Sequence, residues 1–206
     1  MLVVGLGNPG RDRAHNRHNI GFMAVDAIQR RYGFPSFRSK FEGEAADGEI
    51  AGHRVTLLKP MTYMNESGRS VAQAVRFYRV PPAEVLVLHD EIDLAAAKLR
   101  VKRGGGHAGH NGLRSIHAHI GADYARIRLG VGRPEHKGEV LTHVLKDFSK
   151  DDAVWLEKLI DAVAEHVPLV LAGDDGAFMS KVVHAVQGPR PKKPRPDAEG
   201  PPKEET

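Results

Sequence analysis

Three short apolar runs, each followed at once by polar residues, limit the folds open to this chain more than any other feature. The runs cover residues 1–6, 55–58 and 85–88 and consist mostly of Val and Leu. Such runs are typical of strands buried on both faces of a parallel sheet. The segments between them repeat apolar residues with the 3.6-residue period of amphipathic helices. This alternation predicts an α/β fold, a single domain with a mixed, mostly parallel twisted sheet flanked by helices.

Weaker patterns complete the expected order of elements. Strands are expected at 44–59 (a hairpin), 97–103 and 124–132, and helices from 19 to 33 and at 66–79, 111–120, 150–172 and 175–186. Gly52 lies near the turn of the hairpin, and Pro168 is expected to kink the fourth helix. Asn19 is a suitable N-cap for the first helix, and Gly33 is suited to end it.

The polar residues that follow the three apolar runs predict a binding site. Ligands of open α/β sheets bind outside the carboxyl ends of the parallel strands. If the three runs are parallel neighbours, Asn8, Asn65 and Asp90 converge on one crevice. His15 and His18 lie in the loop after the first run and are close enough in sequence to reach it.

Composition places the chain in a class and excludes several others. It contains no cysteine, which removes disulfides, thiolate metal sites and cysteine nucleophiles and suits a reducing compartment. No apolar stretch reaches the roughly 18–20 residues that span a bilayer, and no signal-peptide pattern is present, so we expect a cytoplasmic protein without membrane contact. Residues 189–206 contain six prolines and are expected to form a disordered Pro/Lys/Glu-rich tail after a catalytic domain at 1–188.

A glycine motif at the start of the chain suggests a nucleotide cofactor, but its context does not fit. Gly5, Gly7 and Gly10 match G-x-G-x-x-G directly after the first run. A dinucleotide fold would enter its helix at the third glycine and end a strand in an acidic residue about 20 residues later. Here a polar loop at 11–19 intervenes, and no strand near residue 30 ends in an acid. We therefore expect no cofactor.

Histidine spacing leaves a metal site as an alternative. His15 and His18 are three residues apart, as are His107 and His110, and residues 89–93 add three carboxylates. Three such ligands can bind zinc. The chain has no H-E-x-x-H motif, however, and the pairs lie beside glycines. We expect no metal, and a metal-dependent hydrolase stays the alternative.

If the crevice performs hydrolysis, water is the expected nucleophile. The chain lacks both cysteine and the G-x-S-x-G motif of serine hydrolases. A neutral imidazole can take a proton from water while a carboxylate orients the ring and stabilises the imidazolium. His18 with Asp90 is the best pair for this role, although both could instead be structural.

Basic residues recur on two expected strands beside glycine-rich turns. Lys98, Arg100 and Lys102 alternate with apolar residues, and so do Arg126 and Arg128. Such alternation places them on one strand face. Further basic residues follow at Arg133 and Lys137, and Asn111 is expected to start a helix whose N-terminal amides favour an anion. The pattern favours a track for the phosphates of a nucleic acid over a merely solvated face.

Six sequence segments together identify a family. GLGNPG, NRHNIGF, KPMTYMNESG, HDEIDL, GGGHAGHNGLRSI and RIRLGVGRP closely resemble, in the same order, the bacterial peptidyl-tRNA hydrolases over residues 2–187. The resemblance implies a cofactor-free monomer that cleaves the ester between a peptide and the 3′ ribose of tRNA. Such an enzyme recycles peptidyl-tRNA that has left the ribosome early. It implies no obligate protein partner.

The resemblance also assigns roles to individual residues. His18 is the general base, Asp90 orients it, and Asn8 serves the preference for N-blocked acyl groups. The residues expected to hold the peptide and the tRNA end are Tyr63, Met64, Asn65, His110 and Asn111. Those expected to bind tRNA phosphate are Arg100, Lys102, Arg128 and Lys137.

Three positions depart from the family pattern. Arg13 stands where a Tyr is usual, Asn16 where a Thr is usual, and Ala108 where a Gly is usual. The change at Arg13 predicts weaker or more salt-sensitive binding of the tRNA end. A non-enzymatic RNA-binding module on the same fold is a second alternative, because a plant organellar splicing factor shares this scaffold.

Overall fold

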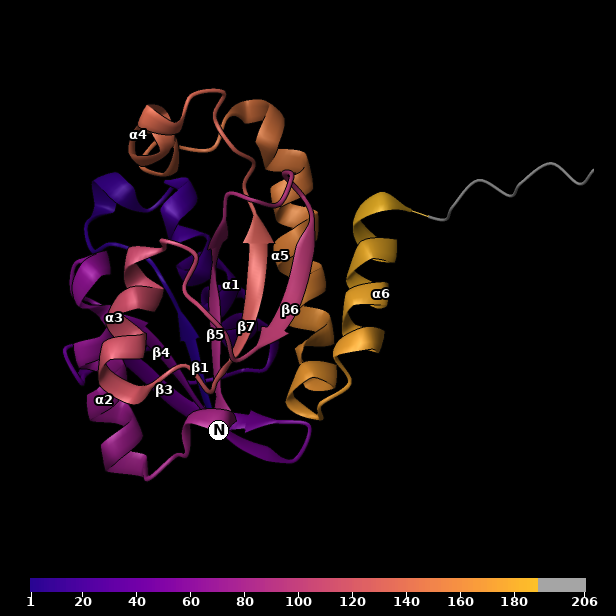
Figure 1. Ribbon diagram of the computed structural model, residues 1–206. Helices are drawn as coiled ribbons and strands as arrows, with labels where there is room; N and C mark the ends of the chain where they lie inside the picture. The colour runs from indigo at the N-terminus through magenta and orange to yellow at the C-terminus, as the bar shows by residue number, and fades with distance from the viewer. Residues whose placement is uncertain (189–206) are drawn as a thin grey trace, which may run out of the picture.

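The computed structural model describes residues 1–188, with the side chain of Lys137 excepted (Figure 1). The expected tail at 189–206 lies outside the described residues. Within the described part, the strands are β1 (Leu2–Gly5), β2 (Arg38–Lys40), β3 (Gly43–Ile50), β4 (His53–Pro60), β5 (Val85–Glu91), β6 (Leu99–Arg103) and β7 (Ala125–Gly130). The helices are α1 (Ile20–Arg31), α2 (Ser67–Tyr78), α3 (Asn111–Ile120), α4 (Val140–Val144), α5 (Lys150–Leu171) and α6 (Asp175–Gln187).

The strands form a seven-stranded sheet in the order β2-β3-β4-β1-β5-β7-β6. The four central strands, β4, β1, β5 and β7, are parallel neighbours, whereas β2, β3 and β6 are antiparallel to theirs. The predicted mixed α/β sheet is therefore confirmed, with its parallel part at the centre. Because the three apolar runs belong to β1, β4 and β5, their carboxyl ends lie at one edge, as expected.

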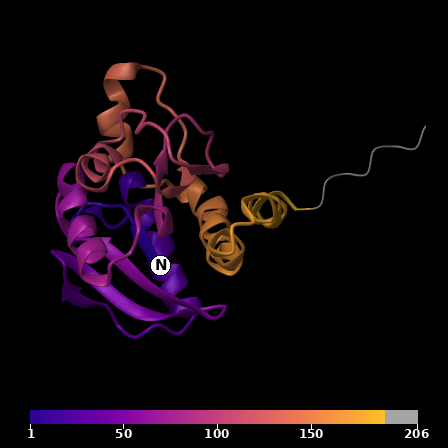
Figure 2. The same cartoon turned by 60° about the horizontal axis from the view of Figure 1, so that its bottom comes forward.

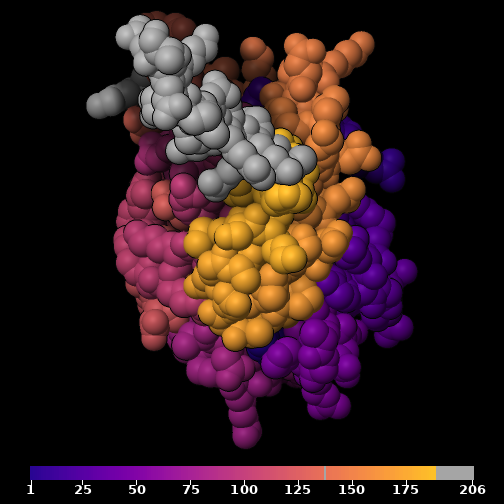
Figure 3. Space-filling view, turned by 90° about the vertical axis from the view of Figure 1, so that its right-hand side faces the viewer, coloured from indigo at the N-terminus to yellow at the C-terminus, as the bar shows by residue number. Residues whose placement is uncertain are grey.

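Side chains of the central strands alternate between two apolar layers. On β1, Val3 packs with α1, α5 and α6, whereas Leu2 and Val4 pack with α2 and α3. Figures 1 and 2 show these helix groups on opposite sides of the sheet. Figure 3 shows α6 and part of α5 forming the outer surface of one side. No helix in residues 1–188 is long and apolar enough to cross a membrane.

Several element boundaries differ from the sequence predictions. The strand β2 and the short helix α4 were not predicted. The strand β5 runs three residues past its apolar run, because His89, Asp90 and Glu91 continue the parallel pairing with β7. The helix α5 continues through Pro168, and Gly33, with φ 64°, follows the end of α1 as predicted.

The side-chain cap predicted for α1 was wrong, whereas α3 starts at Asn111 as predicted. Asn19 precedes α1, but its side chain makes no cap bond and instead contacts the loop after β1. Asn111 is the first residue of α3, and His110 is its cap: the ring Nδ1 of His110 accepts from the backbone N–H of Gly112 and Leu113, at 3.1 and 3.3 Å. The amides that were expected to attract an anion are therefore already partnered.

Candidate active site

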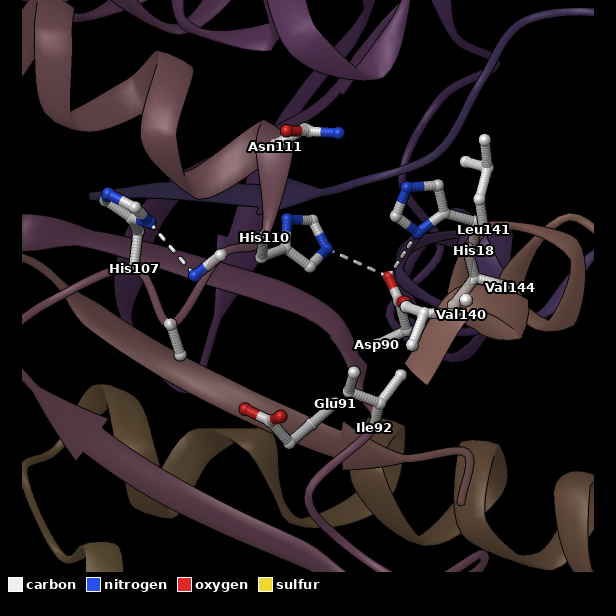
Figure 4. A pocket seen from close by; sticks show the side chains of 13 residues that line it. His18, Asp90, Glu91, Ile92, His107, His110, Asn111, Val140, Leu141 and Val144 are labelled. Carbon is white, nitrogen blue, oxygen red and sulfur yellow. Dashed lines mark hydrogen bonds and ion pairs between the residues drawn. The ribbon is translucent and has the colours of Figure 1, made fainter. Parts of the chain in front are cut away.

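One carboxylate oxygen of Asp90 lies at the centre of the site. Oδ1 of Asp90 lies 2.8 Å from Nδ1 of His18 and 3.0 Å from Nε2 of His110 (Figure 4). Asp90 is 3 % exposed and His18 is 8 % exposed. The strand β5 carries Asp90 past the apolar run, the turn Arg17–Asn19 carries His18, and the cap of α3 supplies His110. Three separate segments thus meet at one atom.

Hydrogen bonding defines the proton positions on both rings. Nδ1 of His110 accepts two backbone N–H groups, so its Nε2 carries the hydrogen and donates to Asp90. The contact of His18 Nδ1 with the same carboxylate makes Nδ1 the donor there. His18 therefore has Nε2 free to accept a proton.

Electrostatics favour an ionised Asp90 beside a basic His18. Burial alone would raise the pKa of Asp90, but the neighbouring His18 and His110 and their hydrogen bonds outweigh it and hold the pKa well below its usual range. Burial lowers the pKa of His18, yet the charge and hydrogen bond of Asp90 outweigh this and raise it above its usual value. The carboxylate is thus too weak a base to take a proton, and the imidazole is the stronger one.

His89 lies next to this pair but is kept neutral. Burial, with the neighbouring His110, lowers the pKa of His89 to about 3. Its Nδ1 donates to the backbone carbonyl of Asp90 at 2.7 Å. Its neutral ring therefore supports the strand end and takes no part in proton transfer.

A cavity of about 420 Å³ opens beside the pair. One side is polar and includes His18, Asp90, His110 and Asn111. The opposite side is apolar and consists of Ile92, Val140, Leu141 and Val144, three of them from α4. Figure 4 shows Asn111 beside His110 on the α3 side, with the α4 side chains across from it. The cavity therefore offers a general base, an amide and an apolar wall to one ligand.

Asn8 links the loop after β1 to two neighbours. Its backbone N–H donates to Oδ1 of Asn19 at 3.0 Å, and Nδ2 of Asn19 donates to its carbonyl at 2.9 Å. Its own Oδ1 accepts from the backbone N–H of Met64 at 2.9 Å. Because the oxygen is engaged, the amide nitrogen of Asn8 is left as a donor. The loop after β1 therefore contacts the loop after β4. The predicted convergence of Asn8, Asn65 and Asp90 on one crevice was wrong, because only Asp90 lines the 420 Å³ cavity and Asn8 lines a separate one.

The Tyr63–Asn65 segment divides its side chains between surface and core. Tyr63 is 61 % exposed, and Asn65 is also exposed. Met64 is buried, and a Cβ on Gly112 would lie only 2.6 Å from its sulfur. Met64 therefore joins this loop to α3 by packing. Arg13 reaches the same surface, with Cζ 6.0 Å from the Tyr63 ring centroid.

The basic residues on β6 and β7 have different surroundings. Arg100 and Lys102 are exposed on β6, whereas Nε of Arg128 pairs with the buried Glu91 at 2.9 Å. Arg126 is 2 % exposed and donates to the carbonyls of the glycine turn at 104–106, so its predicted place on a phosphate track was wrong. The side chain of Lys137 lies outside the described part of the structure.

A metal ion fits this cluster poorly. The facing atoms of His18, Asp90 and His110 lie within 4.8 Å of one another, which is compatible with a metal site. Nε2 of His110, however, carries a hydrogen, because Nδ1 caps α3. Coordination through Nε2 would move that hydrogen to Nδ1 and break both cap bonds. His15 is no further ligand: it lines a separate groove between α1 and α5.

Comparisons with known proteins place the chain in a family. The model of the peptidyl-tRNA hydrolase family matches residues 2–191. A peptidyl-tRNA hydrolase of Ruegeria sp. strain TM1040 is 56 % identical, covering 92 % of this chain and 76 % of the relative, and one of Methylobacterium radiotolerans is 58 % identical, covering 91 % and 93 %. The chain belongs to the peptidyl-tRNA hydrolase family. The crystal structure of peptidyl-tRNA hydrolase from Acinetobacter baumannii, 42 % identical, superposes with a TM-score of 0.83, covering 88 % of this chain and 93 % of that one.

Membership in the peptidyl-tRNA hydrolase family confirms the resemblance seen in the motifs, and the structure adds residues that they did not single out. Arg17 and Asn19 flank His18 and anchor it on both sides. The apolar wall from α4 was also missed. The NRHN motif at residues 16–19 was recognised in the sequence, but the contacts of Arg17 were not. Its partners lie about 130 residues away in the chain, so no local pattern indicates them.

Proposed function

We propose that this chain hydrolyses the ester bond between the peptide, or another N-blocked acyl group, and the 3′ ribose of tRNA. The observation that carries the proposal is the free Nε2 of His18, which borders the cavity while Nδ1 is held by the ionised Asp90. A prematurely released peptidyl-tRNA is the substrate, so the reaction recycles tRNA during translation. We place it in the cytoplasm and expect a monomer.

In the proposed mechanism His18 acts as the general base. Nε2 takes a proton from a water molecule, the hydroxide attacks the ester carbonyl, and a tetrahedral oxyanion forms. Asp90 stabilises the imidazolium, and His110 prevents Asp90 from turning away. His18 then returns the proton to the leaving 3′ oxygen of the ribose. The products are free tRNA and the acyl group as a carboxylic acid.

Amide side chains select the acyl group by hydrogen bonding. The amide nitrogen of Asn8 is an available donor, and Asn111 lines the cavity beside His110. Asn65 adds a third amide at the surface of the adjoining loop. Amides match the carbonyl and N–H groups of a peptide backbone, and one such donor aimed at an oxyanion contributes about 3 kcal/mol to catalysis.

Positive charge on β6 supplies the binding of tRNA phosphate. Arg100 and Lys102 are exposed side chains, consistent with phosphate contacts. Arg128 is held by Glu91, so we assign it a smaller share. Recognition of this kind follows the shape and charge of the acceptor end and does not require base reading.

The direct test compares N-acetyl-aminoacyl-tRNA with unblocked aminoacyl-tRNA, with and without a chelator. The expected result is rapid release of the acyl group from the blocked substrate alone, unchanged by the chelator. Loss of activity on chelation would establish the metal-dependent alternative. Binding of tRNA without cleavage would identify an RNA-binding module instead.

A further inference from the structure

The turn that carries His18 is fastened to the segment that follows α4. Arg17 precedes His18, and its Nη1 donates to the backbone carbonyls of Lys146 and Asp147, at 3.3 and 2.8 Å. Its Nη2 pairs with Oδ2 of Asp152 at 3.0 Å. The backbone N–H of Arg17 also donates to the carbonyl of Lys146, at 3.1 Å. A single side chain thus holds both the connection after α4 and the first turn of α5.

Neighbouring contacts join the same two segments. Nδ2 of Asn16 donates to Oδ1 of Asp147 at 2.8 Å, and the backbone N–H of Phe148 donates to the carbonyl of His15 at 3.0 Å. The guanidinium of Arg17 lies 5.4 Å from the centroid of the Phe148 ring. We call the contacts of Arg17 with residues 146–152 the Arg17 clamp.

The ion pair of the clamp is mostly buried, and its carboxylate has further hydrogen-bond partners. The side chains of Arg17 and Asp152 are 13 % and 20 % exposed, so solvent screens the pair less than an ordinary surface ion pair. Asp152 is also held by the capping box with Ser149 and by Nε1 of Trp155, at 3.0 Å. Arg17 therefore contacts a partner that is already fixed in place.

The clamp connects two sides of the catalytic cavity. Residues 145–149 join α4 to α5, and α4 supplies the apolar wall of Val140, Leu141 and Val144. On the other flank of His18, Asn19 exchanges two hydrogen bonds with the backbone of Asn8. The general base is thus anchored on one flank to the loop after β1 and on the other to the segment that follows the cavity wall.

We propose that Arg17 is a positioning residue for the hydrolysis, which fixes the separation between His18 and the α4 wall of the cavity. The inference rests on the proposed role of His18. The guanidinium does not touch the cavity and acts through the segments that it joins. Displacing a catalytic group by about 1 Å can lower a rate about 100-fold. Loss of the clamp should therefore lower kcat by a larger factor than it changes KM.

The test measures kcat and KM of R17A and R17K on N-acetyl-aminoacyl-tRNA. For R17A we expect kcat to fall about 10- to 100-fold while KM changes less than about threefold. R17K keeps the charge but lacks the planar fork, so it should recover part of kcat. The matched control is R31A, which breaks the 3.1 Å pair of Arg31, the last residue of α1, with Glu165 of α5. It should stay within about twofold of the wild type.

Folding and local mobility are checked in the same samples. Trp155, the only tryptophan, lies against the clamp, and its fluorescence shows that each variant is folded at the assay temperature. Hydrogen exchange in R17A should rise together in residues 14–19 and 145–149. D152N also weakens the capping box, so it is measured alone as well: in R17A/D152N kcat should fall by less than the product of the two single effects, because both changes break the same ion pair.

Two results would overturn the positioning role. One is a kcat for folded R17A no lower than that of R31A, and the other is unchanged hydrogen exchange in both segments. Either result leaves the proposed hydrolysis intact if the wild type still cleaves the blocked substrate. If the wild type does not cleave it, the proposed function fails, and the exchange experiment still decides whether the clamp couples the two segments.

Discussion

Replacing Asp90 with Asn isolates the charge on which the proposed mechanism depends. The amide oxygen of D90N can still accept from both histidines, so the geometry is kept and only the negative charge is lost. At the 2.8 Å separation from His18, unit charges attract by about 6 kcal/mol at an effective dielectric constant of about 20. The loss therefore falls on the imidazolium that forms in the transition state. The attraction of about 6 kcal/mol is the upper limit of this effect, and a drop in kcat of about 10³- to 10⁴-fold lies within it.

The pH profile of D90N has a defined direction. His18 must be neutral to accept a proton, so the rate rises with pH through the pKa of His18. In the wild type Asp90 raises this pKa against the opposing effect of burial. Without the carboxylate the burial effect remains, and the other ring facing the site, His110, adds no negative charge. The acid limb of the profile should therefore move to lower pH while the plateau falls.

The assay is acyl release from N-acetyl-aminoacyl-tRNA at saturating substrate between pH 5 and pH 9, a window that spans the titration of histidine. The matched control is D93N, an Asp to Asn change at an exposed residue three positions further along, which breaks the 2.8 Å pair with Arg133. The control should keep kcat within about twofold. A kcat of D90N within about tenfold of the wild type would refute the charge argument, since a single general base contributes ~10²–10⁴ in rate. An acid limb at the same pH as in the wild type would refute it as well.

Three further changes test the binding surface and the packing. Arg13→Tyr should lower KM for the tRNA substrate and reduce its salt dependence, measured as KM between low and moderate salt; an unchanged KM and slope would contradict the role given to this position. Lys102→Gln should raise KM at unchanged kcat and reduce the slope of log KM against log salt by about 0.7–0.9 for one lost phosphate contact. Gly112→Ala should destabilise the fold by about 1–3 kcal/mol, because its Cβ would lie 2.6 Å from the sulfur of Met64. Thermal unfolding measures this against Gly176→Ala, whose Cβ meets little in α6, and equal melting temperatures would refute the packing argument.

The sequence predicted the central fold because local patterns there agree with the tertiary structure. The apolar runs became the parallel strands, and the helix predicted at 111–120 has those bounds. The strand β2 was missed because its three polar residues carry no strand pattern and depend on pairing with β3. The strand end at His89–Glu91 was missed because polar residues are buried there by pairing with β7.

Site residues could be predicted where they directly follow a strand. They were harder to predict where their role depends on contacts with residues distant in the chain. His18 and Asp90 could be paired because one lies in the loop after β1 and the other at the end of a neighbouring strand. Asn19 has the residue type of a cap, but its partner Asn8 lies across a loop. Arg126 alternates like a surface residue and instead fixes the carbonyls of the glycine turn. Alternation gives the face of a strand but not what covers that face.

The central claim is that His18 activates water for cleavage of the blocked ester. The most direct measurement is single-turnover cleavage of N-acetyl-aminoacyl-tRNA by H18Q, with tRNA binding measured on the same sample. The account predicts a loss of at least about 100-fold in the cleavage rate at unchanged binding. Cleavage by H18Q at a rate near that of the wild type would contradict it.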